Sequence, residues 1–156
     1  MIEYRHSVLP DIYKLAKDLR QADIDEVLAA TGESPQKALF RGFISSTECF
    51  TLYHEQTGEP VAMFGYRVIE PKVLASIWML GSERLFEGRW RFLRKSAVWI
   101  DYLNTKADLL YNTVDQRNTL HIRWLNWLGF KFVRVIPDFG PSKMPFVEFA
   151  RLRHGS

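Results

Sequence analysis

A long amphipathic segment between two apolar strands constrains this chain more than any other feature. Its apolar residues recur at spacings of four, three, four and three, at Phe86, Trp90, Leu93, Ala97 and Ile100. This period is typical of an α-helix with one buried face. The apolar runs on either side, 74–80 and 109–114, are predicted to be strands. A strand, a helix and a second strand in this order imply a right-handed crossover and a parallel pair of strands within a mixed sheet.

Further strands and helices precede and follow this unit. Runs rich in β-branched and aromatic residues predict strands at 2–9, 49–54, 61–69, 131–136 and 146–152, and helical spacing predicts helices at 11–31, 35–43 and 119–128. The first helix bends near Ala22, and 137–141 forms an irregular connection. The order β-α-α-β-β-β-α-β-α-β-β predicts an α/β fold. Because no repeat, low-complexity tract or linker interrupts it, residues 1–156 are expected to form a single domain.

Composition restricts the classes of function. The 156 residues are 47% apolar, enough to build a core, and 21 basic against 18 acidic residues give a net charge of +3. This excess is too small to indicate a nucleic-acid-binding protein, and it fits a small anionic ligand or an acidic partner. No apolar run approaches the roughly 20 residues of a membrane helix, and the first residues are too polar for a signal peptide. We therefore expect a cytosolic protein with no membrane segment.

Cysteine and histidine usage indicates neither a disulfide nor a metal site. The single cysteine, Cys49, excludes an internal disulfide and fits a reducing compartment. The four histidines are dispersed, at positions 6, 54, 121 and 154. Because no cysteine accompanies them at ligand spacing, no metal ion is expected.

One block of the sequence carries a family resemblance. The strand end Val114-Asp115-Gln116-Arg117-Asn118, followed by Trp124-Leu125-Asn126-Trp127-Leu128-Gly129-Phe130, resembles the second conserved block of the Gcn5-related N-acetyltransferases (GNAT). The order of elements agrees with this family along nearly the whole chain. The resemblance implies that Asn118 lies where two parallel strands separate, in contact with the pantetheine arm of acetyl-CoA or with a helix end. A simpler reading stays open, since Asn118 and Gly129 also suit the start and end of any helix.

The first conserved block of the family departs from its usual pattern. The family follows its fourth strand with a glycine-rich loop whose N–H groups hold the coenzyme A pyrophosphate, because a Cβ would obstruct the phosphate. Here Gly88 is the one glycine near the helix start, and Glu83 and Glu87 would repel an anion. The nearby arginines are either replacements for the backbone donors or the solvated face of a helix. The residues predicted to bind the cofactor are Met79, Leu80, Gly81, Arg84, Gly88, Arg89 and Asn118.

No catalytic residue is assigned. The family often uses a tyrosine seven residues after the conserved asparagine as the acid, and Leu125 occupies that position. It commonly has a glutamate on the fourth strand, where this chain has Ile77 and Trp78. His121 has a suitable intrinsic pKa for a base but is equally well read as a packed or surface residue, and Asp115 is no better supported.

A closer resemblance concerns proteins of short-tailed bacteriophages. The segments Trp78-Met79-Leu80-Gly81, Phe92-Leu93-Arg94 and Asn112 to Phe130 are similar to small podovirus proteins of acetyltransferase-like fold, some of them internal virion proteins. The similarity covers roughly Tyr4 to Ala150. It implies a phage protein that acts in the host cytoplasm or is carried in the virion, and it does not by itself imply catalysis.

Two functional hypotheses follow, and a third is less favoured. The first is an N-acetyltransferase that uses acetyl-CoA to modify an amine of a protein or small molecule, in an opening between the fourth and fifth strands. The second is a catalytically degenerate GNAT-like protein, monomer or homodimer, that binds a host or virion protein through exposed aromatic and arginine residues. Nucleic-acid binding through residues 84–95 is disfavoured because Trp90, on the apolar stripe, is expected to be buried.

Overall fold

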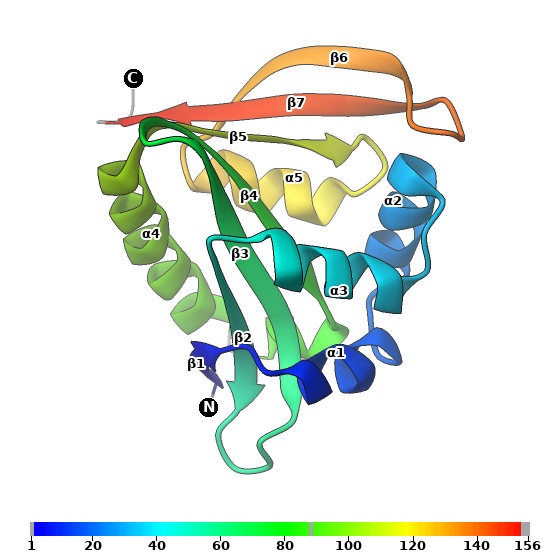
Figure 1. Cartoon of the computed structure of the whole chain (residues 1–156), viewed down its shortest axis with the longest axis vertical. Coiled ribbons are helices and arrows are strands. Elements are labelled where there is room, and N and C mark those ends of the chain that lie inside the picture. Colours follow the sequence, from blue (N-terminus) through cyan, green and yellow to red (C-terminus); the bar gives the residue numbers. More distant parts are fainter. Residues whose placement is uncertain (1, 88, 154–156) are drawn as a thin grey trace.

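The computed structural model of the chain describes residues 2–87 and 89–153. Within these ranges, seven strands form one sheet in the order β1-β2-β3-β4-β5-β7-β6 (Figure 1). The strands are β1 (Ile2–His6), β2 (Glu48–His54), β3 (Pro60–Glu70), β4 (Lys72–Gly81), β5 (Ala107–Asp115), β6 (Lys131–Phe139) and β7 (Met144–Leu152). The helices are α1 (Leu9–Ala16), α2 (Gln21–Thr31), α3 (Pro35–Ser45), α4 (Arg89–Lys106) and α5 (Thr119–Trp127), with a short 3-10 helix η1 (Glu83–Phe86).

The predicted α/β fold and the order of its elements are confirmed, and the structure divides the bent first helix in two. Helix α1 ends at Ala16, and α2 begins at Gln21. The backbone of Arg20, between them, is extended, and its N–H donates to the carbonyl of Gly81 at 2.9 Å. The chain leaves the helical conformation because this bond ties the start of α2 to the end of β4.

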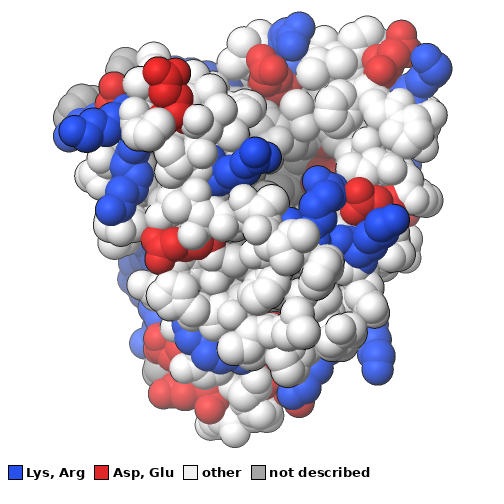
Figure 2. All heavy atoms as spheres, viewed as in Figure 1, with Lys and Arg blue, Asp and Glu red and all other residues white. Residues whose placement is uncertain are grey.

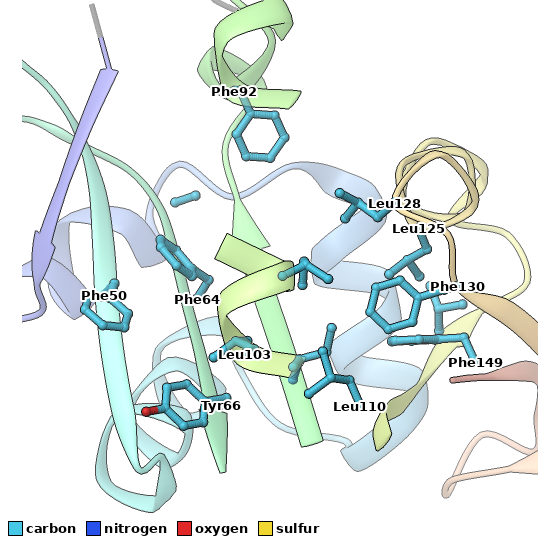
Figure 3. Close-up of a cluster of buried hydrophobic side chains, with 14 of the residues drawn as sticks. Phe50, Phe64, Tyr66, Phe92, Leu103, Leu110, Leu125, Leu128, Phe130 and Phe149 are labelled. Atoms are coloured by element: carbon cyan, nitrogen blue, oxygen red, sulfur yellow. The ribbon is translucent and has the colours of Figure 1, made fainter. Parts of the chain in front are cut away.

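The helices cover the sheet on both faces. On one face, called here the α1–α3 face, Ile12, Leu15 and Leu39 pack against Met63 and Leu80 of the sheet. On the other, the α4–α5 face, a larger cluster joins the sheet to α4 and α5. Figure 3 shows side chains converging in this second cluster, among them Phe64, Leu103 and Leu125. Successive side chains of a strand point to opposite faces of the sheet, so neighbouring residues pack into different clusters.

The two central strands diverge. Strands β4 and β5 are the one parallel pair among the described strands, and their register runs from Lys72 opposite Ala107 to Ser76 opposite Tyr111. Beyond Ser76, β4 continues to Gly81 with β3 as its partner, and β5 continues to Asp115 with β7 as its partner. The far halves of β4 and β5 therefore leave a gap in the middle of the sheet, which is the opening expected from the sequence.

Two local predictions are wrong. Trp90 is 69% exposed, and the buried residues of α4 are Phe92, Ser96, Ile100, Leu103 and Asn104. The predicted apolar stripe begins at Phe86, which belongs to the separate 3-10 helix η1. Because a 3-10 helix has fewer residues per turn than an α-helix, the spacing that starts at Phe86 does not mark the buried face of α4. The predicted irregular connection at 137–141 begins inside β6, whose register with β7 is interrupted between Ile136 and Phe139.

Candidate functional site

A cavity of about 410 Å³, called here the central cavity, lies at the gap between β4 and β5. Its lining on the α1–α3 face includes Glu26, Arg41, Arg67 and Trp78, and on the α4–α5 face Phe92, Trp99, His121 and Trp124. The walls thus come from both layers of helices, and residues 76–80 and 112–113 of the diverging strands lie between them. A cavity of this size, mostly apolar with a few polar groups, is typical of a small-molecule site.

The backbone polar groups of three alternate residues of β4, Ile77, Met79 and Gly81, point into the gap. The side-chain amide of Asn112 donates to the carbonyl of Ile77 at 2.6 Å. Further along, Gly81 donates its N–H to Asp23 at 2.9 Å and accepts from the N–H of Arg20. Because peptide groups two residues apart in a strand point to the same side, the N–H and C=O of Met79 also face the gap. The backbone of Leu80 faces β3 instead, and its side chain is buried under α1–α3.

Asn118 lies at the far end of the gap, held by residues of α2. It is 1% exposed, and its amide donates to Asp23 at 3.0 Å and more weakly to Glu26 at 3.4 Å. Its side-chain oxygen accepts from Arg20 at 3.4 Å. The side chain does not cap α5, so the simpler helix-cap reading is not what the structure shows. Asn118 instead contacts the start of α2, which is one of the two roles that the resemblance implied.

Glu26 is the acidic side chain that this arrangement brings to the central cavity. Its Oε1 accepts from the backbone N–H of Asp115 at 2.8 Å and from Asn118, while Oε2 has no partner among the described residues. Burial, reinforced by the carboxylates of Asp23 and Asp115, raises the pKa of Glu26 to about 8. A carboxyl group whose pKa is near the pH of the solution can accept and release a proton during a reaction.

The two candidates considered from the sequence have different environments. His121 lines the central cavity from α5, its ring centroid 5.4 Å from that of Trp124, and burial lowers its pKa. It is therefore neutral at physiological pH. Asp115 is buried and accepts hydrogen bonds from Arg117, from its backbone N–H at 2.8 Å and from its guanidinium through Nη2 at 2.7 Å and Nε at 3.1 Å. Asp115 thus stabilises the turn after β5.

The segment after β4 does not form a glycine-rich cradle. Arg84 donates to the carbonyl of Pro60 at 2.9 Å and pairs with Asp18 at 3.2 Å, and Glu83 is exposed. Gly88 lies outside the described residues, and Arg89 is the first residue of α4. A cavity of only about 30 Å³, lined in part by Phe86 and Leu120, lies beside this segment. That volume holds about one water molecule.

These observations divide the predicted cofactor site in two. The gap beside Met79 is suited to a narrow arm of the pantetheine type, because the backbone N–H and C=O of Met79 face it. In the segment 82–87, the N–H groups of Ser82, Leu85 and Glu87 are bonded within the chain, so a pyrophosphate would find fewer free backbone donors there than in a glycine-rich loop. Within 2–87 and 89–153, no three His, Cys, Asp or Glu side chains are placed to hold a metal ion. None of the described helices has the length and apolar character needed to cross a bilayer.

Glu26 was missed in the sequence, although a signal was present. Asp23 and Glu26 are three residues apart and adjoin Val27 on the buried side of α2. Two acidic side chains on an apolar helix face are unusual, since buried carboxyl groups need partners. The apolar residues of this helix do not mark its buried side on their own, because Leu28 is exposed.

Comparisons with known proteins agree on the fold. No protein-family model and no curated protein matches the chain. Among solved structures, it is similar to a GNAT-family acetyltransferase from Bacillus anthracis, with a TM-score of 0.69, 12% identity, and coverage of 97% of this chain and 94% of that one. It is similar also to the aminoglycoside acetyltransferase AAC(6')-Ib in complex with coenzyme A, with a TM-score of 0.69, 15% identity, and coverage of 99% and 96%. An acetyltransferase of the GNAT family from Streptococcus pneumoniae gives a TM-score of 0.60 at 14% identity, with coverage of 98% and 99%. The chain therefore has the fold of the GNAT acetyltransferases.

Proposed function

We propose that this protein is an acetyl-CoA-dependent N-acetyltransferase that modifies a primary amine. The observation that carries the proposal is the central cavity, which opens through the sheet between β4 and β5 and presents Glu26 beside the gap. Neighbours of the same fold are acetyltransferases, one of them in complex with coenzyme A. An acyl donor on one side of a sheet and an acceptor on the other can meet only through such an opening.

The roles of the residues follow from their positions. Bound acetyl-CoA would supply the acetyl group as an activated thioester. Met79, whose peptide group faces the gap, would hold the arm of the cofactor, and Asn118 and Gly81 keep the end of the gap in place through α2. Glu26 Oε2 takes the proton that an ammonium group must lose before its nitrogen becomes a nucleophile. The apolar walls formed by Trp78, Trp99 and Trp124 exclude water from the acetyl group.

The test separates binding from chemistry. Acetyl-CoA is titrated calorimetrically into the wild type and the Glu26→Gln variant, and transfer is followed by release of free thiol. Because Gln keeps the hydrogen bond from Asp115, we expect unchanged cofactor affinity and transfer slower by roughly 100-fold or more. Absence of heat at millimolar acetyl-CoA with the wild type would remove the enzyme proposal.

A second function is favoured by the exposed face of α4. Trp90, Val98 and Tyr102 form one stripe on this helix and are 69%, 71% and 46% exposed. Such a stripe suits a partner protein, and the closed segment after β4 suits a scaffold that no longer binds coenzyme A. The partner would be a host or virion protein if the chain is a bacteriophage protein of the podovirus type. Affinity purification of the wild type against a Trp90→Ala, Val98→Ser variant tests this, and equal recovery of every co-purifying protein counts against it.

We propose no nucleic-acid role. Although Trp90 is exposed rather than buried, two of the basic side chains within 84–95 are already neutralised. Arg84 pairs with Asp18, and Lys95 pairs with Glu3 at 2.9 Å. The segment therefore offers less free positive charge than its sequence suggests, and phosphate binding depends on such charge.

A further inference from the structure

The charged side chains around the central cavity are unevenly balanced. Glu26 is the one acidic side chain among the described residues that line it, whereas Arg41, Arg67 and Lys95 are basic. Arg41 is paired with Glu33 at 3.0 Å and Lys95 with Glu3. Arg67 makes no ion pair and no side-chain hydrogen bond with any part of the chain that the structure describes. Figure 2, viewed from the α3 side, shows basic side chains on either side of a hollow in this face.

Arg67 stands at the row where the gap begins. In the β3–β4 ladder it lies opposite Ser76, and Ser76 lies opposite Tyr111 in the last pair before β4 and β5 separate. Because Arg67 and Met63 are four residues apart in β3, their side chains lie on the same face of the sheet. Met63 is buried under α1–α3. The guanidinium of Arg67 is therefore exposed on the α1–α3 face of the sheet, the same side as α2, which carries Glu26.

A flat apolar surface lies beside this guanidinium. Trp78 occupies the same face of β4, two residues beyond Ser76, and its indole N–H donates to the hydroxyl of Ser46 at 2.7 Å. Gly42 and Gly65 flank the ring, since a Cβ on either would come within 2.6 Å or 2.9 Å of indole atoms. The two glycines and Ser46 thus fix the orientation of the Trp78 ring within the lining of the central cavity.

We propose that the acceptor is a small primary amine that also carries an anionic group, of the amino-carboxylate or aminophosphonate type, and that Arg67 binds that anion while Trp78 packs against the carbon skeleton. This inference rests on the proposed acetyltransferase function. An arginine without a counter-ion binds a carboxylate or phosphonate in a bidentate, charge-assisted manner. A polycation would instead meet the unpaired guanidinium of Arg67, whose like charge disfavours it. Arg67 is here a residue of substrate specificity, not of proton transfer.

The experiment uses matched acceptors that differ only in the anion. Transfer from acetyl-CoA is measured to L-phenylalanine against phenethylamine, to 2-aminoethylphosphonate against ethanolamine, and to kanamycin as a polycation. We expect the anionic member of a pair to be preferred. In the Arg67→Gln variant, KM for the anionic amines rises about 10- to 100-fold, the loss of one charge-assisted contact, while kcat and the affinity for acetyl-CoA stay unchanged. Arg123→Gln, which removes an exposed arginine outside the cavity lining, is the control and changes neither.

Direct titration of the same amines, calorimetrically and without acetyl-CoA, separates the two proposals. Transfer to neutral or polycationic amines with no preference for the anionic ones overturns the inference and leaves the acetyltransferase standing. If the wild type binds the anionic amines, Arg67→Gln does not, and no acetyl transfer is seen, the anion site is supported and the acetyltransferase proposal is overturned. Unchanged KM and unchanged binding in Arg67→Gln overturn the role of Arg67 in either case.

Discussion

Replacing Glu26 with Gln tests the electrostatics of the site without any knowledge of the substrate. A carboxyl group whose pKa is about 8 in the folded chain and 4.5 in the unfolded chain binds its proton more tightly when folded. Its contribution to stability is therefore complete below pH 4.5 and is lost as the pH rises to about 8. Each pKa unit corresponds to about 1.36 kcal/mol, so over the whole interval the loss approaches roughly 5 kcal/mol.

The cleanest interval for the measurement lies above pH 6.5. The pKa of His121 is lowered from 6.5, so the folded chain binds this proton less tightly, and stability rises with pH until that value is reached. Below pH 6.5 the contributions of His121 and Glu26 thus have opposite signs. Between pH 6.5 and 8, Glu26 alone acts, and the free energy of unfolding should fall by roughly 2 kcal/mol in the wild type relative to Glu26→Gln.

Urea unfolding at half-unit pH steps from 5 to 9 provides the assay. Glu59→Gln, which neutralises an exposed glutamate in the turn between β2 and β3, is the matched control and should follow the wild type. The free energy of unfolding of Glu26→Gln should stay constant between pH 6.5 and 8, and at pH 8 this variant should be more stable than the wild type. Parallel curves for the wild type and Glu26→Gln would refute the raised pKa and with it the assignment of Glu26 as a base at neutral pH.

Three further predictions concern the same region. Asp23→Asn keeps one acceptor oxygen and places an amide donor against either the N–H of Gly81 or the amide of Asn118, and we expect a loss of about 2–5 kcal/mol in urea unfolding; a loss under 0.5 kcal/mol would show that this network is not needed. Gly42→Ala forces a Cβ to within 2.6 Å of the Trp78 ring, which should cost about 1–3 kcal/mol and raise KM for the acceptor, whereas wild-type values for both would mean that the ring moves freely. In a pH–rate profile, kcat/KM for transfer should rise and level off above about pH 8, and a profile unchanged by Glu26→Gln would exclude this carboxyl group as the base.

The sequence was sufficient to predict the fold because the signals involved are local. Strand and helix periods, and turns such as Gly58 and Gly129, are read within a few residues, and their order leaves few topologies. The opening between β4 and β5 was also predictable, because it accompanies the strand–helix–strand unit that ends at Asn118. The error at Trp90 arose where a 3-10 helix adjoins an α-helix, since the two differ in residues per turn and apolar spacing cannot be continued from one into the other.

The chemistry of the site was not predictable from the same signals, because it depends on contacts between segments far apart in the chain. Asn118 meets Asp23 across 95 positions, and Asp115 donates to Glu26 across 89. The raised pKa of Glu26 is a result of burial by the sheet and of two other carboxylates, none of which a local pattern shows. Arg67 is similar, since an exposed arginine on a strand is ordinary until the other basic residues around the cavity prove to be paired elsewhere.

The end of β4 and the acidic group at the cavity are linked through α2. In place of a glycine-rich segment, the side chain of Asp23 and the backbone of Arg20 hold both polar groups of Gly81, and so fix where β4 ends. The same Asp23 binds Asn118 and, by its charge, helps to raise the pKa of Glu26 one turn further along the helix. One helix therefore both sets the width of the gap and carries the group that receives the proton. A substitution that loosens the start of α2 should for this reason alter cavity shape and the proton affinity of Glu26 together, whereas Arg67→Gln should leave that proton affinity unchanged.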